Sequence, residues 1–251
     1  MNKIIVANWK MNPQNSKSAE KIFFDISKKI NNKKNEVVIC PPYPFLFIKN
    51  KLKDKKIKLG SQDVFFEKEG SFTGEVSSSM LSDFGVSYTI LGHSERRALG
   101  EDNTLINKKI KALLKSKIKP ILCVGETDRD HNGFYLSLIK SQIEEGLKDV
   151  TKNQIKNIII AYEPIWAIGK DANREATPQE FIEIKIFIKK ILSILYGPKI
   201  VDSVFVLYGG SVHPSNASSF VKEGDADGLL VGRDSLNPDK FLDIVSILNN
   251  I

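Results

Sequence analysis

The chain has 251 residues, of which 41% are hydrophobic and 27% are charged, and its formal net charge is +7 at pH 7. This composition is ordinary for a folded globular protein and excludes an intrinsically disordered chain. A chain of this length can form one α/β barrel or two smaller domains. No apolar run approaches the roughly 18 residues of a membrane span, so we expect no membrane partner.

The start of the chain and its two cysteines favour the cytoplasm. Only a short apolar run precedes Asn8, which is too little for the core of a signal peptide. Cys40 and Cys123 lie in apolar runs without the paired spacing of a zinc site. We therefore expect free buried thiols, no bound metal and a reducing, cytoplasmic environment.

Lysines are concentrated in three stretches, 28–34, 49–58 and 108–119. A nucleic-acid surface is one interpretation. In two of these stretches, however, apolar residues recur at helical spacing. One such stripe has lysines opposite it and is formed by Leu105, Ile106, Ile110, Leu113 and Leu114. Aromatic residues that could stack on bases are absent from the third stretch and sparse near the others. We therefore interpret the lysines as solvated helix faces and expect no nucleic-acid partner.

Short β-type runs alternate with helical patterns along the whole chain. Most of these runs are continuously apolar, as expected for parallel strands that are buried on both faces, and the segments between them can hold crossover helices. The predicted strands are 3–8, 36–40, 57–62, 87–92, 120–125, 157–163, 203–208 and 227–232.

The clearest helix start is at Thr177. The sequence "TPQE" supplies a capping threonine, a proline in the first turn and Glu180 to complete a capping box. No low-complexity linker interrupts the strand–helix alternation. We therefore predict that residues 1–251 form a single (β/α)8 barrel domain of the TIM-barrel type rather than an open sheet.

Polar residues and glycines follow several of the predicted strands. In a barrel, the loops after the strands meet at one mouth, where the chemistry is carried out. Each residue also has an ordinary structural interpretation: a solvated lysine, a hydrogen-bonded histidine, a carboxylate that closes a strand, or glycines in turns. Their joint placement at strand ends favours a site that contains Asn8, Lys10, His93, Glu163, Gly209, Gly210 and Gly232.

These residue types share one chemical task. A carboxylate such as Glu163 can remove a proton from carbon only next to a carbonyl, and His93 can donate a hydrogen bond that polarises that carbonyl. A nearby lysine would stabilise enediolate charge. Backbone amides at the glycine-containing loops, followed by helix starts, suit a phosphate. The residues therefore predict isomerisation of a small phosphorylated carbonyl compound without a cofactor.

Six segments, spread in order along almost the full chain, resemble the triosephosphate isomerase family. They are "ANWKMN", "GSFTGEVS", "ILGHSERR", "AYEPIWAIG", "LYGGSV" and "DGLLVG". The resemblance implies interconversion of dihydroxyacetone phosphate and D-glyceraldehyde 3-phosphate, in glycolysis and gluconeogenesis, with no cofactor. It also implies that Glu163 is the base that moves the proton and that His93 is a neutral electrophile at a helix N-terminus.

The resemblance extends to further site residues. Asn8 and Lys10 would contact the substrate, Glu95 would bond towards Lys10, Ser94 would begin a helix, and Arg96 and Arg97 would hold the loop and the subunit interface. The implied phosphate-binding set is Gly169, Ser211, Gly232 and Arg233, with Gly209 and Gly210 shaping the seventh loop. Residues 67–77 would dock into a second copy in a homodimer, through Phe72, Thr73 and Gly74.

The chain departs from the family pattern in two places. Arg233 and Asp234 follow Gly232 where the family commonly has Gly-Gly or Gly-Asn, so we expect a phosphate contact from the Arg233 amide and side chains that point away. The lid segment 170–176 is two residues longer than usual and lacks its second glycine. We expect the lid still to close about hinges at 164–166 and 174–176, because two added residues change loop-closure entropy only slightly.

Two rival functions use only part of this pattern. Another sugar-phosphate isomerase or a phosphate-binding synthase on the same barrel would share the glycine-containing cradle but would not need Lys10, His93 and Glu163. A basic nucleic-acid-binding protein would use the lysines alone, and salt-dependent binding to duplex DNA would reveal it.

Overall fold

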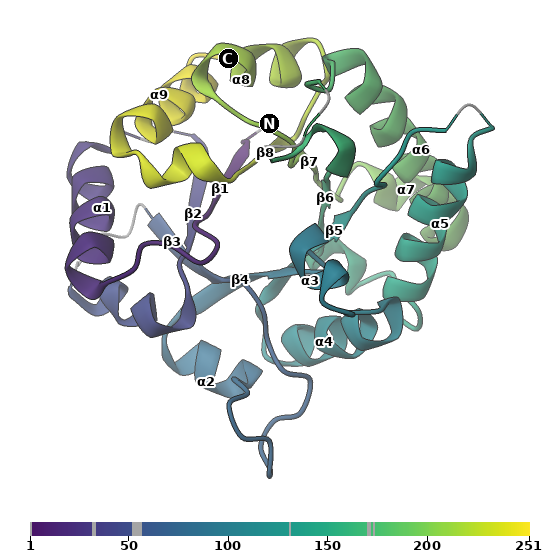
Figure 1. Cartoon of the computed structure of the whole chain (residues 1–251). Coiled ribbons are helices and arrows are strands. Elements are labelled where there is room, and N and C mark those ends of the chain that lie inside the picture. Colours follow the sequence, from purple (N-terminus) through teal and green to yellow (C-terminus); the bar gives the residue numbers. More distant parts are fainter. Residues whose placement is uncertain (1, 32–33, 52–56, 131, 170–171, 173) are drawn as a thin grey trace.

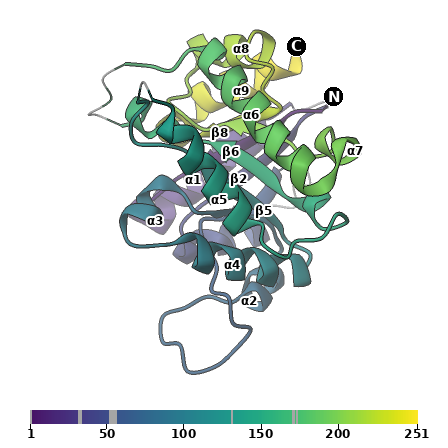
Figure 2. The same ribbon diagram turned by 90° about the vertical axis from the view of Figure 1, so that its right-hand side faces the viewer.

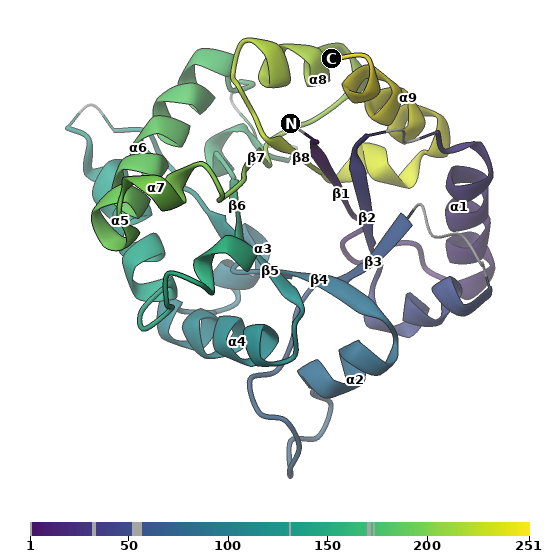
Figure 3. The same cartoon turned by 180° about the vertical axis from the view of Figure 1, so that it is seen from behind.

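A computed structural model describes residues 2–31, 34–51, 57–130, 132–169, 172 and 174–251. Its eight parallel strands close into one barrel in chain order, and helices surround the barrel (Figures 1 and 3). The strands are β1 (Ile4–Asn8), β2 (Glu36–Cys40), β3 (Ile57–Ser61), β4 (Val86–Leu91), β5 (Lys119–Val124), β6 (Ile159–Tyr162), β7 (Val206–Tyr208) and β8 (Gly228–Val231). The predicted (β/α)8 fold is therefore confirmed.

Helices follow the strands around the outside of the barrel. They are α1 (Ser16–Lys29), α2 (Ser78–Asp83), α3 (Ser94–Ala98), α4 (Asn103–Lys115), α5 (Phe134–Gly146), α6 (Pro178–Tyr196), α7 (Pro198–Val201), α8 (Pro214–Lys222) and α9 (Pro238–Asn249). Four 3₁₀ segments are η1 (Tyr43–Lys51), η2 (Ile155–Asn157), η3 (Ile165–Ala167) and η4 (Arg233–Leu236). None of the helices in the described part of the chain is long and apolar enough to cross a membrane.

The barrel closes because β1 pairs with β8 on one side and with β2 on the other. Side chains along each strand alternate between two buried clusters. In β1, Val6 packs inside the barrel, whereas Ile5 and Ala7 pack outwards against the helices. This burial on both faces explains why the strands read as continuous apolar runs. All eight predicted strands are present, although β6 and β7 start later than expected.

The two cysteines are free and completely buried within the barrel, as predicted. Burial raises the pKa of the Cys40 thiol, and it is also the main reason why the pKa of the Cys123 thiol is raised. Both groups are thus kept as neutral thiols.

The predicted start of α6 is also confirmed. Thr177 Oγ1 accepts a hydrogen bond from the Glu180 amide at 3.2 Å, and the Thr177 amide donates to Glu180 Oε2 at 2.8 Å. Behind this cap, Phe181 packs edge-on against Tyr208, and the Tyr208 ring stacks on Phe220 with 3.5 Å between ring centroids. The cap and these rings place α6 next to β7, together with residues 174–176, which lead from the lid into α6 and are called the lid return below.

One lysine of the stretch 108–119 contradicts the prediction of a solvated face. Lys109 is only 3% exposed, and its ammonium contacts Asp63 Oδ1 at 2.7 Å and also the Glu101 carboxylate. Arg96 adds a second cation at 2.8 Å from Asp63. A buried charge is costly unless it is paired, and these two carboxylates supply the pairing. The lysine therefore ties α4 to the loop after β3.

The segment 65–77 projects away from the barrel as a long loop beside α2 (Figures 1 and 2). Its base is closed by a bond from the Phe65 amide to the Val76 carbonyl. The Phe72 ring lies 4.7 Å from the Phe65 ring but remains 43% exposed. An exposed aromatic ring on a projecting loop leaves apolar surface available for another molecule.

Candidate active site

A cavity of about 570 Å³ lies at the mouth of the barrel, where the loops after the strands meet. It brings together every residue that the sequence assigned to catalysis or phosphate binding, as well as the supporting Glu95. These are Asn8, Lys10, His93, Glu95, Glu163, Gly169, Gly209, Gly210, Ser211, Gly232 and Arg233. Residues that are up to 225 positions apart in the chain thus line one cavity, because the carboxyl ends of all the parallel strands lie on the same side of the barrel.

The loop after β1 holds Lys10 in an unusual conformation. Its φ is +52°, a left-handed value that costs a non-glycine residue on the order of 1 kcal/mol or more. Asn8 Oδ1 accepts from the Lys10 amide at 3.0 Å, and Gln62 Nε2 donates to the Lys10 carbonyl at 2.9 Å. The Lys10 ammonium lies 2.7 Å from Glu95 Oε1, which is the contact predicted from sequence. The strained backbone and the ion pair together aim the ammonium into the cavity.

His93 occupies the N-cap of α3, so that Ser94 begins the helix as expected. The Glu95 amide donates to His93 Nδ1 at 3.2 Å. Because Nδ1 accepts this bond, the proton of a neutral imidazole lies on Nε2. That nitrogen is 3.3 Å from Glu163 Oε1. The ring is 7% exposed and therefore presents a fixed donor to the cavity.

Glu163 follows β6 directly and is 2% exposed. Its Oε2 accepts from the Ser94 amide at 3.0 Å. The contact between Oε1 and His93 lacks hydrogen-bond geometry, so Oε1 has no hydrogen-bond partner among the residues the structure describes. The backbone amide of Glu163 donates to the Val124 carbonyl at 2.8 Å, which anchors the residue to the end of β5. A buried carboxylate with one free oxygen is suited to accept a proton.

The glycine after β5 lets the chain pass very close to Glu163. A Cβ atom on Gly125 would lie 1.8 Å from the Glu163 carbonyl oxygen. Gln142 of α5 fixes this glycine from the other side, since Oε1 accepts from its amide at 2.8 Å and Nε2 donates to its carbonyl at 3.0 Å. The position of Glu163 therefore depends on a residue that carries no side chain.

Glycines and a serine line the opposite end of the cavity. Gly169 has φ +92°, which favours glycine, and Ser211 Oγ donates to the Ala167 carbonyl at 2.8 Å. A Cβ atom on Gly232 would lie 3.6 Å from Lys10 Cε. This end of the cavity thus combines backbone amides with the lysine, a combination that suits an anion.

The residues that depart from the family pattern are accommodated at this end. Arg233 begins η4, and Asp234 pairs with Lys240 at 3.1 Å. The ammonium of Lys240 thereby offsets part of the charge of the Asp234 carboxylate, which lines the cavity. Of the extended lid, positions 170, 171 and 173 lie outside the described residues.

Arg96 and Arg97 of α3 hold the loop after β4, which is the local part of the role expected for them. The Arg97 guanidinium donates to the Gly92 carbonyl at 2.8 Å and to the Cys123 carbonyl at 3.1 Å. Arg96 pairs with Asp63, as described above. These contacts fix His93 relative to the ends of β4 and β5.

Sequence reasoning missed three residues near the site. Glu126 is 1% exposed and accepts from Trp166 Nε1 at 2.8 Å and from Tyr162 Oη at 2.7 Å, which fixes the entry of the lid. Glu175 and His213 line the cavity and contact each other. The position of His213, just after "GGSV", was the available signal for it. Nothing in the sequence marks Glu175 as its partner.

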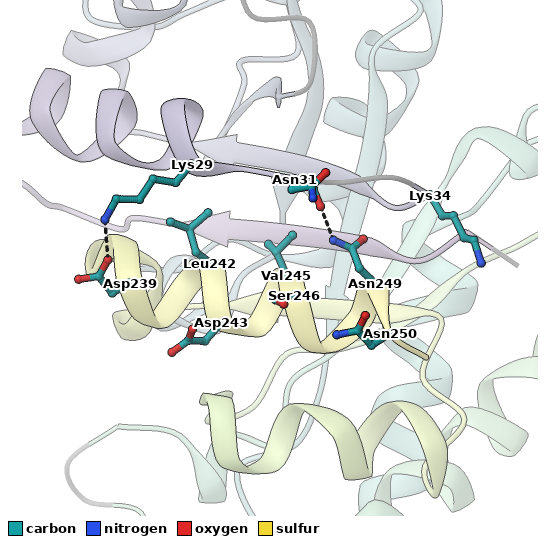
Figure 4. Close-up of a pocket in the computed structure, with 10 residues that line it drawn as sticks. All are labelled: Lys29, Asn31, Lys34, Asp239, Leu242, Asp243, Val245, Ser246, Asn249 and Asn250. Carbon is teal, nitrogen blue, oxygen red and sulfur yellow. Dashed lines mark hydrogen bonds and ion pairs between the residues drawn. The ribbon is translucent and has the colours of Figure 1, made fainter.

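A larger cavity of about 700 Å³ lies elsewhere, in the groove between α1 and α9 (Figure 4). Its charges are surface lysines and aspartates, including Lys29 and Asp239, whose side chains pair at 3.0 Å. None of the described residues that line this groove belongs to a strand. Within the described residues, no group of three or more potential metal ligands is assembled.

Comparison with known proteins agrees with this geometry. The family described as "Triosephosphate isomerase" matches residues 3–248. Proteins named triosephosphate isomerase from Dictyoglomus turgidum and Carboxydothermus hydrogenoformans are 43% and 44% identical to the chain. The first alignment covers 97% of this chain and 98% of the relative, and the second covers 96% of each. A third, from Aquifex aeolicus, is 43% identical over 98% of this chain and 99% of its own. The chain therefore belongs to the triosephosphate isomerase family and is an isomerase.

Proposed function

We propose that the chain interconverts dihydroxyacetone phosphate and D-glyceraldehyde 3-phosphate through an enediolate. The observation that carries this proposal is the placement of a buried carboxylate, Glu163, 3.3 Å from the protonated nitrogen of His93 at the mouth of the barrel. Proton transfer between neighbouring carbons needs one base and one donor to the carbonyl oxygen. The two groups face the same cavity, and the amide-rich wall opposite them suits the substrate phosphate.

In this mechanism Glu163 removes a proton from the carbon next to the carbonyl. The electron pair of the broken C–H bond moves into the enediolate, while the carbonyl oxygen accepts a hydrogen bond from His93 Nε2. The ammonium of Lys10 stabilises the negative charge, and Asn8 holds the backbone of Lys10. Glu163 then returns the proton to the adjacent carbon. His93 Nε2 gives its proton to the former carbonyl oxygen and takes the hydroxyl proton from the neighbouring oxygen, so that the product again has one hydroxyl and one carbonyl group. Both protein groups end in their starting protonation states, and no cofactor is needed.

The phosphate would be held by the amides of Gly169, Gly232 and Arg233 and by Ser211, with Gly209 and Gly210 shaping the loop after β7. The lid would close over it, moving about hinges at 164–166 and 174–176. Such closure excludes water from the enediolate.

We further propose that the chain acts as a single domain, residues 1–251, and as a homodimer in the cytoplasm, within glycolysis and gluconeogenesis. The projecting loop supports the dimer, because Phe72, Thr73 and Gly74 belong to it and are exposed. No second molecule beyond the triose phosphate and another copy of the chain is needed for this function.

A coupled assay with D-glyceraldehyde 3-phosphate tests the reaction. Glu163→Asp retracts the carboxylate by one methylene and should lower kcat several hundred-fold or more, since about 1 Å of misplacement costs about 100-fold. Glu144→Asp is the matched control, because Glu144 is a half-buried residue of α5 that does not line the cavity, and it should leave kcat unchanged. A Glu163→Asp enzyme with near-normal turnover would remove Glu163 from the role of base. Turnover of pentose phosphates in place of trioses would favour the rival isomerase.

A further inference from the structure

Two carboxylates line the same end of the cavity as the phosphate-binding residues. They belong to Glu175, on the return of the extended lid, and Asp234, after β8. An unpaired carboxylate beside a phosphate dianion would weaken binding, because like charges repel. Asp234 has a cationic partner in Lys240, as described above. The Glu175 carboxylate needs a partner that holds it away from the anion.

The partner of Glu175 is His213, in the loop after β7. His213 Nε2 lies 3.0 Å from Glu175 Oε1. A carboxylate can only accept, so this contact requires the proton of the ring to be on Nε2. The guanidinium of Arg174 is not the partner of the Glu175 carboxylate. It pairs with Glu180 and donates to the Glu175 backbone carbonyl at 3.1 Å.

The ring of His213 is itself fixed to the loop that carries Ser211. Its Nδ1 is 2.7 Å from Ser215 Oγ, and the His213 amide donates to Asn216 Oδ1 at 3.0 Å. The amide nitrogen of Asn216 donates to the Ser211 carbonyl at 2.8 Å. It also lies 2.9 Å from His213 Nε2, but a protonated Nε2 cannot accept from it, so only the Ser211 carbonyl takes this donor. The imidazole is therefore a rigid donor that holds the lid return against the phosphate end of the site.

We propose that His213 is a positioning residue for substrate phosphate: by donating a hydrogen bond to Glu175 it holds that carboxylate aside from the anion. This inference rests on the proposed function, because it assigns the anion at this end to the substrate. It also accounts for an acidic residue in the lid return of an enzyme that must bind an anion. The pair is partly exposed, with side chains 30% and 61% accessible, so its effect should be modest and sensitive to salt.

The test is a double-mutant cycle of His213→Ala and Glu175→Gln. His213→Ala frees the carboxylate and should raise KM for D-glyceraldehyde 3-phosphate and Ki for inorganic phosphate about three- to fivefold, with kcat changed less than about twofold. The increase should shrink at high salt. Glu175→Gln alone should leave KM unchanged or lower. In the double variant, KM should return to the Glu175→Gln value, because no carboxylate is left to restrain.

A purely structural role predicts a different pattern. If His213 only supports the start of α8, the increase in KM persists in the double variant, and that result would overturn the proposal, as would an unchanged KM in His213→Ala. His213→Gln keeps a donor and should restore KM to within about twofold, which also covers the case in which the alanine variant folds poorly. Lys29→Ala, which breaks an ion pair of the same length in the groove between α1 and α9, is the control and should leave KM unchanged.

Calorimetric titration with inorganic phosphate separates this inference from the proposed function. If the wild-type chain binds phosphate but does not turn over the triose, the proposed reaction fails. The double-mutant cycle is then evaluated from the Kd of each variant for inorganic phosphate. If His213→Ala and the wild type bind phosphate equally, the inference fails even when isomerase activity is present.

Discussion

Replacing Gly125 with alanine moves the proposed base without changing its chemistry. The new Cβ would lie 1.8 Å from the Glu163 carbonyl oxygen, whereas real Cβ contacts essentially never fall below 3.0 Å. The two backbones must therefore separate by about 1.2 Å. Gln142 holds the Gly125 side through two hydrogen bonds, so part of this displacement falls on Glu163.

The expected loss follows from the displacement. A shift of about 1 Å in a catalytic group costs about 100-fold in rate, or about 2.7 kcal/mol of barrier. The same overpacking should lower the free energy of unfolding by about 1 to 3 kcal/mol. Gly209→Ala gives an intermediate case, because its Cβ would lie 3.1 Å from Glu163 Cγ and the neighbour need yield only a few tenths of an ångström. For that variant we expect a loss of several-fold in kcat.

Gly146→Ala in α5 is the matched control. Its Cβ would lie 3.5 Å from Leu122 Cδ2, an ordinary contact, and alanine is favoured over glycine within a helix by about 1 kcal/mol. We expect unchanged kcat and a slightly higher melting temperature. The coupled isomerase assay gives kcat, and circular dichroism melts confirm that each variant is folded. A folded Gly125→Ala enzyme with kcat within about threefold of wild type would show that the rate does not depend on where Glu163 lies.

Three further predictions address the interface, the lid and acid stability. Thr73→Arg places a charge in the proposed dimer contact, so light scattering should detect more monomer and activity should fall in parallel; a fully active monomer would exclude this interface from the mechanism. Crystals with a tight-binding phosphate analogue should show a closed lid with the Gly169 amide bonded to phosphate, and a lid that stays open would mean that the insertion has altered closure. Hydrogen bonds from Arg174 lower the pKa of Glu180 to about 2, so this pairing stabilises the fold above about pH 4.5, and the stabilisation is lost as pH falls through about 2. The difference in unfolding free energy between wild type and Arg174→Met should therefore shrink from pH 6 to pH 2. A constant difference would refute the linkage.

The strands and the mouth of the barrel were predictable because local signals and topology agree. Continuous apolar runs require burial on both faces, and parallel strands in a barrel deliver their ends to one side. The strand ends could therefore be assembled into a site from the sequence. The cap at Thr177 was predictable for a similar reason, since all of its hydrogen bonds lie within four residues.

The parts that the sequence did not reveal depend on partners that are distant in the chain. Lys109 is flanked by solvated lysines, and only the folded chain shows that Asp63 and Glu101 draw it into the interior. The pairing of Glu175 with His213 likewise joins residues that are 38 positions apart. Electrostatic pairing of this kind has no periodicity, so a pattern in the sequence cannot identify it.

The two buried cysteines give the barrel a pair of built-in reporters. Cys40 lies on β2 and Cys123 on β5, and both are sealed from solvent within the barrel. A thiol reagent can reach either sulfur only when the strands around it separate, so the rate of labelling at each position measures local opening. Comparing the two rates, without introducing any cysteine, shows whether the β2 and β5 sides of the barrel open together or independently.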